Sequence, residues 1–179
     1  VGIVGLMGAG RTALAMSLFG QSYGPRISGR MPLNRRAVTL PSPQKAIRHG
    51  LAYLTEDRKS AGLILMDDVR HNISLASLGK LSNRQGIIDD NREITVAEDL
   101  RHKLRIKTPS IFQKIGHLSG GNQQKAILAR WIYADPDVLI LDDLAYVSKE
   151  QAETSALCEL ISTRYERRPM IITASQPQP

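Results

Sequence analysis

The sequence has little of several residue types that mark other protein classes. It contains one cysteine, Cys158, among 179 residues, so an internal disulfide is excluded. Aromatic residues make up 4% of the chain, which argues against recognition of single-stranded nucleic acid by base stacking. The four histidines are scattered without the spacing of metal ligands. No apolar run reaches the length of about 18 residues that indicates a membrane-spanning helix.

Positive charge is the main bias of the composition. The 24 basic and 17 acidic residues give a net charge of +7, which fits a nucleotide, a nucleic acid or an anionic membrane face as a partner. A solvated basic surface explains the charge equally well. The length suits one domain, with or without an inserted subdomain. The chain begins at Val1 inside an apolar strand and ends at Pro179 just after another, so we expect it to be a fragment.

Apolar strand patterns alternate with helical patterns along the chain. Strands are expected at Val1–Gly5, Leu51–Thr55, Val138–Asp142 and Met170–Ala174. Helices are expected over 11–19, 42–49, 67–79, 89–104, 119–133 and 148–167, whereas 22–41 has an irregular composition. The alternation predicts an α/β fold with a parallel sheet covered on both faces.

The first strand leads into a glycine-rich run with the spacing of a phosphate-binding loop. The run is Gly5-Leu6-Met7-Gly8-Ala9-Gly10-Arg11-Thr12. Its backbone N–H groups and the helix that follows suit a phosphate, and the Thr12 hydroxyl would hold Mg²⁺. Arg11 stands where lysine is usual, and its planar guanidinium need not reach the terminal phosphates in the same way. A plain glycine turn is the alternative.

A second glycine-rich run precedes the helix expected at 119–133. It reads Leu118-Ser119-Gly120-Gly121-Asn122. The hydroxyl, the bare N–H groups and the positive helix end suit a polyphosphate. The alternative is a flexible turn in which Ser119 caps the helix.

Carboxylates follow two of the expected strands. Asp142 closes the apolar run Val138–Leu141, a place from which it would bind Mg²⁺ through water, and Asp143 comes next. The alternative for Asp142 is a cap of the strand end. Glu56 follows the strand at 51–55 in a charged segment, for which an exposed turn is the alternative.

The glycine-rich run at 5–12, the second run at 118–122 and the apolar strand that ends in Asp142 follow one another along the chain. In this order they resemble the ATP-binding subunits of ABC transporters. Over residues 1–142 the chain is most similar to the second ATP-binding half of bacterial sugar importers of the ribose/xylose/galactoside type. The resemblance implies a P-loop NTPase fold with a parallel RecA-like sheet and an inserted helical subdomain. It divides the chain into a first part of the ATPase core at 1–65, a helical subdomain at 66–117, the signature helix and Walker B strand at 118–142, and a C-terminal segment at 143–179.

The resemblance also implies a function, which is ATP hydrolysis coupled to sugar uptake, with ATP and Mg²⁺ as cofactors. The partners would be a second ATP-binding half and membrane permease subunits, and the chain would lie on the cytoplasmic face of the inner membrane. The groups at the chain's own phosphate site would be Gly5, Gly8, Ala9, Gly10, Arg11, Thr12 and Asp142. Those serving the partner's ATP would be Ser119, Gly120, Gly121 and Asn122.

Several positions depart from the family pattern, so we expect impaired hydrolysis. Glu56 replaces the glutamine of the Q-loop. Asp143 stands where the family has the glutamate that polarises the attacking water, and it is one methylene shorter. No histidine follows position 117, so a switch histidine is absent.

The C-terminal segment carries a different likeness. Residues 137–179 resemble the IstB/DnaC-like helper ATPases of transposition, in which Asp142 and Asp143 would be the Walker B pair and Ser175 the sensor. This suggests a chimera joined at Val138–Asp142, a strand that both families would place beside the strand feeding the glycine loop. Two rival functions remain open: a transposition helper that binds DNA with ATP, and a non-catalytic nucleotide-binding module.

Overall fold

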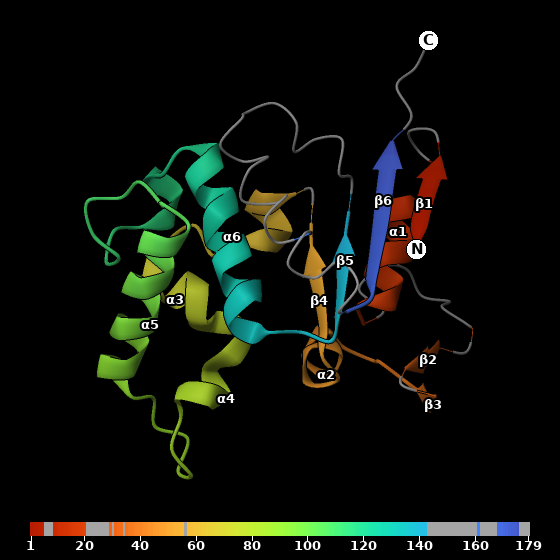
Figure 1. The fold of residues 1–179 in the computed structure, drawn as a ribbon, viewed down its shortest axis with the longest axis horizontal. Helices are drawn as coiled ribbons and strands as arrows, with labels where there is room; N and C mark the ends of the chain where they lie inside the picture. Colours follow the sequence, from red (N-terminus) through yellow and green to blue (C-terminus); the bar gives the residue numbers. More distant parts are fainter. Residues whose placement is uncertain are drawn as a thin grey trace. The chain divides into compact units, whose positions relative to one another are not determined.

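The protein folds into two compact units. A computed structural model describes residues 1–5, 9–20, 29, 31–33, 35–55, 57–142, 161 and 168–175 (Figure 1). The first unit is built from Val1–Glu56, Pro136–Tyr146 and Tyr165–Pro179, and the second from Asp57–Asp135 and Val147–Arg164. A unit that contains a sheet is therefore interrupted in sequence by a helical unit.

A parallel sheet forms the centre of the first unit. Its strands, in spatial order, are β1 (Gly2–Gly5), β6 (Met170–Ser175), β5 (Val138–Leu141) and β4 (Leu51–Leu54). All three neighbouring pairs are parallel, so the four carboxyl ends meet at one edge (Figure 1). The predicted strands and the predicted α/β class with a parallel sheet are confirmed.

The strand order corrects one expectation. The strand at Val138–Asp142 was expected beside the strand that feeds the glycine loop, but β6 lies between β5 and β1. The reason is that β4 occupies one edge of β5, so β6 takes the free edge and β1 pairs with the far side of β6. Strands β4 and β5 are buried at every residue, as continuous apolar runs in a parallel sheet lead one to expect.

The remaining elements of this unit are short. Helix α1 (Arg11–Leu18) follows the glycine loop and packs against β1 and β6. Helix α2 (Pro43–Arg48) begins as predicted, with the Ser42 hydroxyl accepting from the N–H of Lys45. The segment at 22–41 also contains an antiparallel hairpin of β2 (Met31–Leu33) and β3 (Arg36–Val38), which its irregular composition does not predict.

Helices make up the second unit. The long ones are α5 (Asp90–Lys103) and α6 (Gly120–Ala134), and the short ones are α3 (Val69–Ser74) and α4 (Leu78–Leu81). Single turns lie at η1 (Arg58–Gly62), η2 (Leu75–Ser77) and η3 (Ile115–His117). The helix expected over 67–79 is therefore wrong as one element. It is broken at Ser77, whose φ of −140° and ψ of 26° leave the helical region.

Helix α6 packs against α3 and α5, and most of its residues are buried. It ends where Asp135 adopts a left-handed conformation with φ of 52°, and Pro136 then prevents further helix. This agrees within one residue with the end of the helix expected over 119–133. None of the helices in the described parts of the chain is long and apolar enough to cross a membrane. The helix expected from Ser148 lies outside the described residues, apart from Ile161.

Candidate functional site

The glycine loop connects the end of β1 to the start of α1, at the carboxyl edge of the sheet. Gly10 is the residue before the helix, and its φ of 78° is a left-handed conformation that favours glycine. Arg11 is the first helical residue, and the exposed side chain of Thr12 lies in the first turn. Gly8 lies outside the described residues. The helix start therefore directs backbone N–H groups toward the loop.

The side chain of Arg11 lies against the loop with unpaired nitrogen atoms. Its Nε and Nη1 are buried and have no hydrogen-bond partner among the described residues. The aliphatic part of the side chain passes Gly5, where a β-carbon would lie 3.6 Å from Arg11 Cδ and 3.3 Å from the Cβ of Ala9. Buried guanidinium nitrogens are normally hydrogen-bonded, so both remain available as donors with respect to the described residues.

Asp142 follows the last residue of β5 and is 6% exposed. One carboxylate oxygen accepts a 2.7 Å hydrogen bond from the hydroxyl of Tyr53, and the other accepts one of 2.7 Å from the hydroxyl of Thr173. Sequence reasoning missed both hydroxyl groups, because Tyr53 and Thr173 look like ordinary residues of buried strands. Two other candidates from the sequence, Glu56 and Asp143, lie outside the described residues.

The second glycine run forms the start of α6, in the helical unit. Ser119 is the cap residue, but its hydroxyl bonds no backbone N–H and instead accepts from Asn122 Nδ2 at 2.9 Å. Asn122 Oδ1 accepts from the N–H of Lys107 at 2.7 Å. Ser119 is exposed, so the start of α6 can approach an anion in another molecule.

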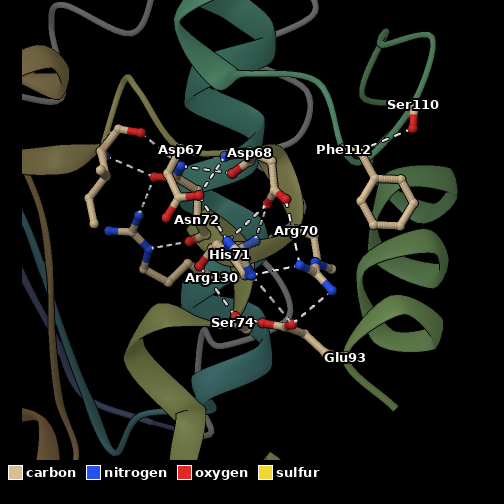
Figure 2. A network of polar contacts seen from close by, with 11 residues as sticks. Asp67, Asp68, Arg70, His71, Asn72, Ser74, Glu93, Ser110, Phe112 and Arg130 are labelled. Carbon is tan, nitrogen blue, oxygen red and sulfur yellow. Dashed lines mark hydrogen bonds and ion pairs between the residues drawn. The ribbon is translucent and has the colours of Figure 1, made fainter. Parts of the chain in front are cut away.

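A buried arginine joins three segments of the helical unit, as Figure 2 shows. Arg130 Nη1 donates to the carbonyl oxygen of Gly62 at 2.7 Å, and its Nε donates to that of Asn72 at 2.7 Å. Burial lowers the pKa of the Arg130 guanidinium to about 10, so it stays charged at neutral pH. The contacts fix η1 and α3 on α6.

One group of acidic residues and a histidine has the composition of a metal site. The candidate ligand atoms of Asp67, Asp68 and His71 lie within 4.8 Å of one another (Figure 2). These groups already bond each other, however. Asp67 Oδ1 lies 2.8 Å from His71 Nδ1, and Asp68 Oδ1 accepts from the N–H of His71 at 2.7 Å as the cap of α3. The cluster therefore has a structural explanation.

With this geometry established, comparison with known proteins decides the family. A family model described as "ABC transporter" matches residues 1–145. The chain belongs to the ABC transporter family. Members of this family bind ATP, typically with Mg²⁺.

Curated relatives of the chain are sugar-transport proteins by name. It is 57% identical over 143 residues to the L-arabinose transport ATP-binding protein AraG of Geobacillus stearothermophilus. It is 50% identical to the xylose import ATP-binding protein XylG of Thermoanaerobacter pseudethanolicus and 47% identical to the ribose import ATP-binding protein RbsA of Clostridium tetani. Each match covers 80% of this chain and 28% of the relative, so the chain spans just over a quarter of their length.

Solved structures share the fold at low sequence identity. A dimeric ATP-binding cassette in a post-hydrolysis state, bound to ADP and Pi, matches with a TM-score of 0.73 and 15% identity, over 97% of this chain and 73% of its own. A nucleotide-free ATP-binding cassette from an ABC transporter matches with a TM-score of 0.71 and 14% identity, over 97% of this chain and 69% of its own. These matches confirm the P-loop ATPase fold of the ABC family.

The comparisons do not support the resemblance of residues 137–179 to IstB/DnaC-like helper ATPases. The family match continues to residue 145, past the expected joint at 138–142. The cassette structures cover 97% of the chain. The likeness to transposition helpers and the DNA-binding rival function are left without support.

Proposed function

We propose that this chain is part of the ATP-binding component of a bacterial sugar-import ABC transporter. The names of its relatives mention arabinose, xylose and ribose. These names support a pentose or a similar sugar as the cargo. Its partners are then a second ATP-binding half and membrane permease subunits, on the cytoplasmic face of the inner membrane. ATP with Mg²⁺ is the cofactor.

The observation that carries this proposal is the pair of buried nitrogens of Arg11, Nε and Nη1, which have no acceptor in the described part of the chain and lie beside the left-handed Gly10. A phosphate group would supply an acceptor for both nitrogens, and the start of α1 favours the same negative charge. The residues present therefore fit a nucleotide phosphate. We assign phosphate binding to the loop Gly5, Gly8, Ala9, Gly10 and Arg11.

The remaining site residues take roles that follow from their chemistry. The Thr12 hydroxyl and the Asp142 carboxylate would hold Mg²⁺, whose charge neutralises the phosphates when it is bound. Glu56 and Asp143 are proposed to bind and polarise water. The start of α6, with Ser119, Gly120, Gly121 and Asn122, would serve the ATP held by a partner, so two ATP-binding halves must join to complete a site.

Titration calorimetry with Mg²⁺ and ATP tests the phosphate site. We expect Arg11→Met to weaken binding by about 10- to 150-fold, because a charged hydrogen bond contributes about 1.5–3 kcal/mol. Arg11→Lys should preserve binding. Gly10→Val should abolish it, since valine is strained at positive φ and its side chain would occupy the loop.

A matched control tests whether the effect of Arg11→Met on ATP binding comes from the position of Arg11 or from the loss of one positive charge. Arg48→Met removes an arginine from the last turn of α2 and should bind ATP like the wild type. If Arg11→Met and Gly10→Val both fold and bind with wild-type affinity, the assignment of the glycine loop is wrong. If all variants bind weakly to the same degree, the charge of Arg11 has no specific role.

A non-catalytic nucleotide-binding module is the second candidate. Two sequence features favour it: Arg11 replaces the usual lysine, and Asp143 replaces the family glutamate. Such a module would bind ATP as above without turnover, so the two candidates differ in hydrolysis and agree in binding.

A further inference from the structure

The carboxylate of Asp142 is held from both sides by hydroxyl groups of neighbouring strands. Tyr53 on β4 donates to Oδ2 and Thr173 on β6 donates to Oδ1, each at 2.7 Å. All three residues are buried, with 7%, 1% and 6% exposure for Tyr53, Thr173 and Asp142. Water is therefore excluded from the two contacts, and the carboxylate has little freedom to rotate.

Strand register explains why these three groups meet. Leu141 pairs with Ile172, so the next residues of the two strands, Asp142 and Thr173, lie side by side. Tyr53 pairs with Ile140, which lies two residues before Asp142 and so projects to the same face of the sheet. The phenol ring is long enough to span this offset and bring its hydroxyl to Asp142.

The same face of the sheet carries the helix of the glycine loop. Phe19, which follows the last residue of α1, packs on the Tyr53 ring with 5.5 Å between centroids. One end of α1 therefore fixes the ring that orients Asp142, and the other end begins at the phosphate loop. Glycine loop, helix and carboxylate form one packed assembly within the first unit.

We propose that Tyr53 and Thr173 are positioning residues that orient Asp142 toward the Mg²⁺ of bound ATP. The proposal rests on the proposed function, in which Asp142 serves the metal. A carboxylate oxygen that accepts one hydroxyl bond keeps a second lone pair, which can accept from a metal-bound water. The two hydroxyls fix the direction of the remaining lone pairs. Partners of this kind tune metal affinity without touching the metal.

Mg²⁺-dependent nucleotide binding by the full chain tests the proposal. The probe is a fluorescent ATP analogue, titrated once with excess Mg²⁺ and once with EDTA, and the measured quantity is the ratio of the two affinities. We expect Tyr53→Phe and Thr173→Val each to lower this ratio by about 10-fold, the effect typical of a lost partner to a metal ligand. Binding in EDTA should not change. Thr173→Ser keeps the hydroxyl and should keep the ratio.

Matched controls remove hydroxyl groups elsewhere. Tyr133→Phe and Thr95→Val change residues of the helical unit and should leave the ratio at its wild-type value. Asp142→Asn should lower the ratio at least as much as the hydroxyl variants do. Circular dichroism confirms that each variant is folded.

The possible failures are distinguishable. If Asp142→Asn lowers the ratio but Tyr53→Phe and Thr173→Val do not, Asp142 serves the metal and the positioning proposal alone is overturned. If Thr173→Ser lowers the ratio as much as Thr173→Val, the hydroxyl is not the cause, which also overturns the proposal. If the wild type and Asp142→Asn show no Mg²⁺ dependence, the metal role of Asp142 fails and the proposal fails with it.

Discussion

Arg130 on α6 donates from Nη2 to the side-chain oxygen of Asn72 on α3, at 3.1 Å, while its Nε donates to the backbone oxygen of the same residue (Figure 2). Asn72 is 1% exposed, and its amide also bonds the backbone of Ile64 and Asp68. The two side chains connect α6 to the segment that precedes α3. The charge of Arg130 is thus stabilised by backbone and amide dipoles.

Removing this arginine should destabilise the protein. We expect Arg130→Met to lower the free energy of unfolding by on the order of 3 kcal/mol, because buried carbonyl groups of Gly62 and Asn72 lose their donor. Arg130→Lys should recover only part of the lost stability, because the ammonium group keeps the charge but cannot reproduce the planar fork of the guanidinium. Urea unfolding measures both. Wild-type stability for Arg130→Met would show that the network contributes nothing.

Gly20 should not tolerate a side chain. Its φ is 122°, and a β-carbon would lie 2.4 Å from the carbonyl carbon of Ser42. We expect Gly20→Ala to cost about 2–4 kcal/mol in thermal unfolding, from strain and from displacement of the chain before α2.

Gly79 is the matched control for Gly20. It lies in α4 with open space around the β-carbon position. Gly79→Ala should be neutral or stabilise the protein by about 0.5–1 kcal/mol, because alanine loses less backbone entropy in a helix. Equal losses for the two variants would contradict the close approach at Ser42.

The stability of the protein should depend on pH through His71. The hydrogen bond to Asp67 raises the pKa of His71 above its ordinary value, with Asp68 acting in the same direction and burial and Arg70 opposing it. The same bond lowers the pKa of Asp67. The stabilisation by the charged pair is thus fully present below about pH 6.5, the ordinary histidine pKa, and is lost as the pH rises through the higher folded pKa. On the acid side it is lost only as the pH falls through the lowered folded pKa of Asp67.

Urea unfolding between pH 5 and pH 8 measures this effect. We expect His71→Gln to reduce the fall in stability with rising pH, whereas His117→Gln, which changes an exposed residue of η3, should not. Because both members of the pair are partly exposed, the difference should also shrink at high salt. Identical profiles of stability against pH for the wild type and His71→Gln would show that His71 does not cause the pH dependence.

The isolated chain should hydrolyse ATP barely above background. Asp143 is shorter than the family glutamate, and in the proposed function the start of α6 from a partner is needed to complete a site. A single missing stabilising group costs on the order of 100-fold in rate. Phosphate release from the purified monomer measures this. A rate of about 1 s⁻¹ or more, typical of a working enzyme, would contradict the expectation of impaired hydrolysis.

Local sequence was enough for the elements that depend on neighbouring residues. The caps at Ser42 and Asp89 and the break at Asp135-Pro136 come from side chains and φ preferences within one turn of the helix they bound. The four strands are recognisable because each is a short, mainly apolar run, interrupted only by Thr173 in the last of them. The glycine loop stands out in the sequence because its spacing is typical of loops that bind phosphate.

Only the tertiary structure decided which strands lie side by side and which groups surround Asp142. Tyr53 and Asp142 are separated by 89 residues and Thr173 and Asp142 by 31, so nothing local specifies their hydrogen bonds. Their meeting depends on β6 taking the free edge of β5, a choice made by the pairing and packing of the whole sheet. The unpaired nitrogens of Arg11 are likewise a property of the folded state. The sequence names the side chain, whereas burial and the absence of an acceptor among the described residues arise only when β1 and α1 pack together.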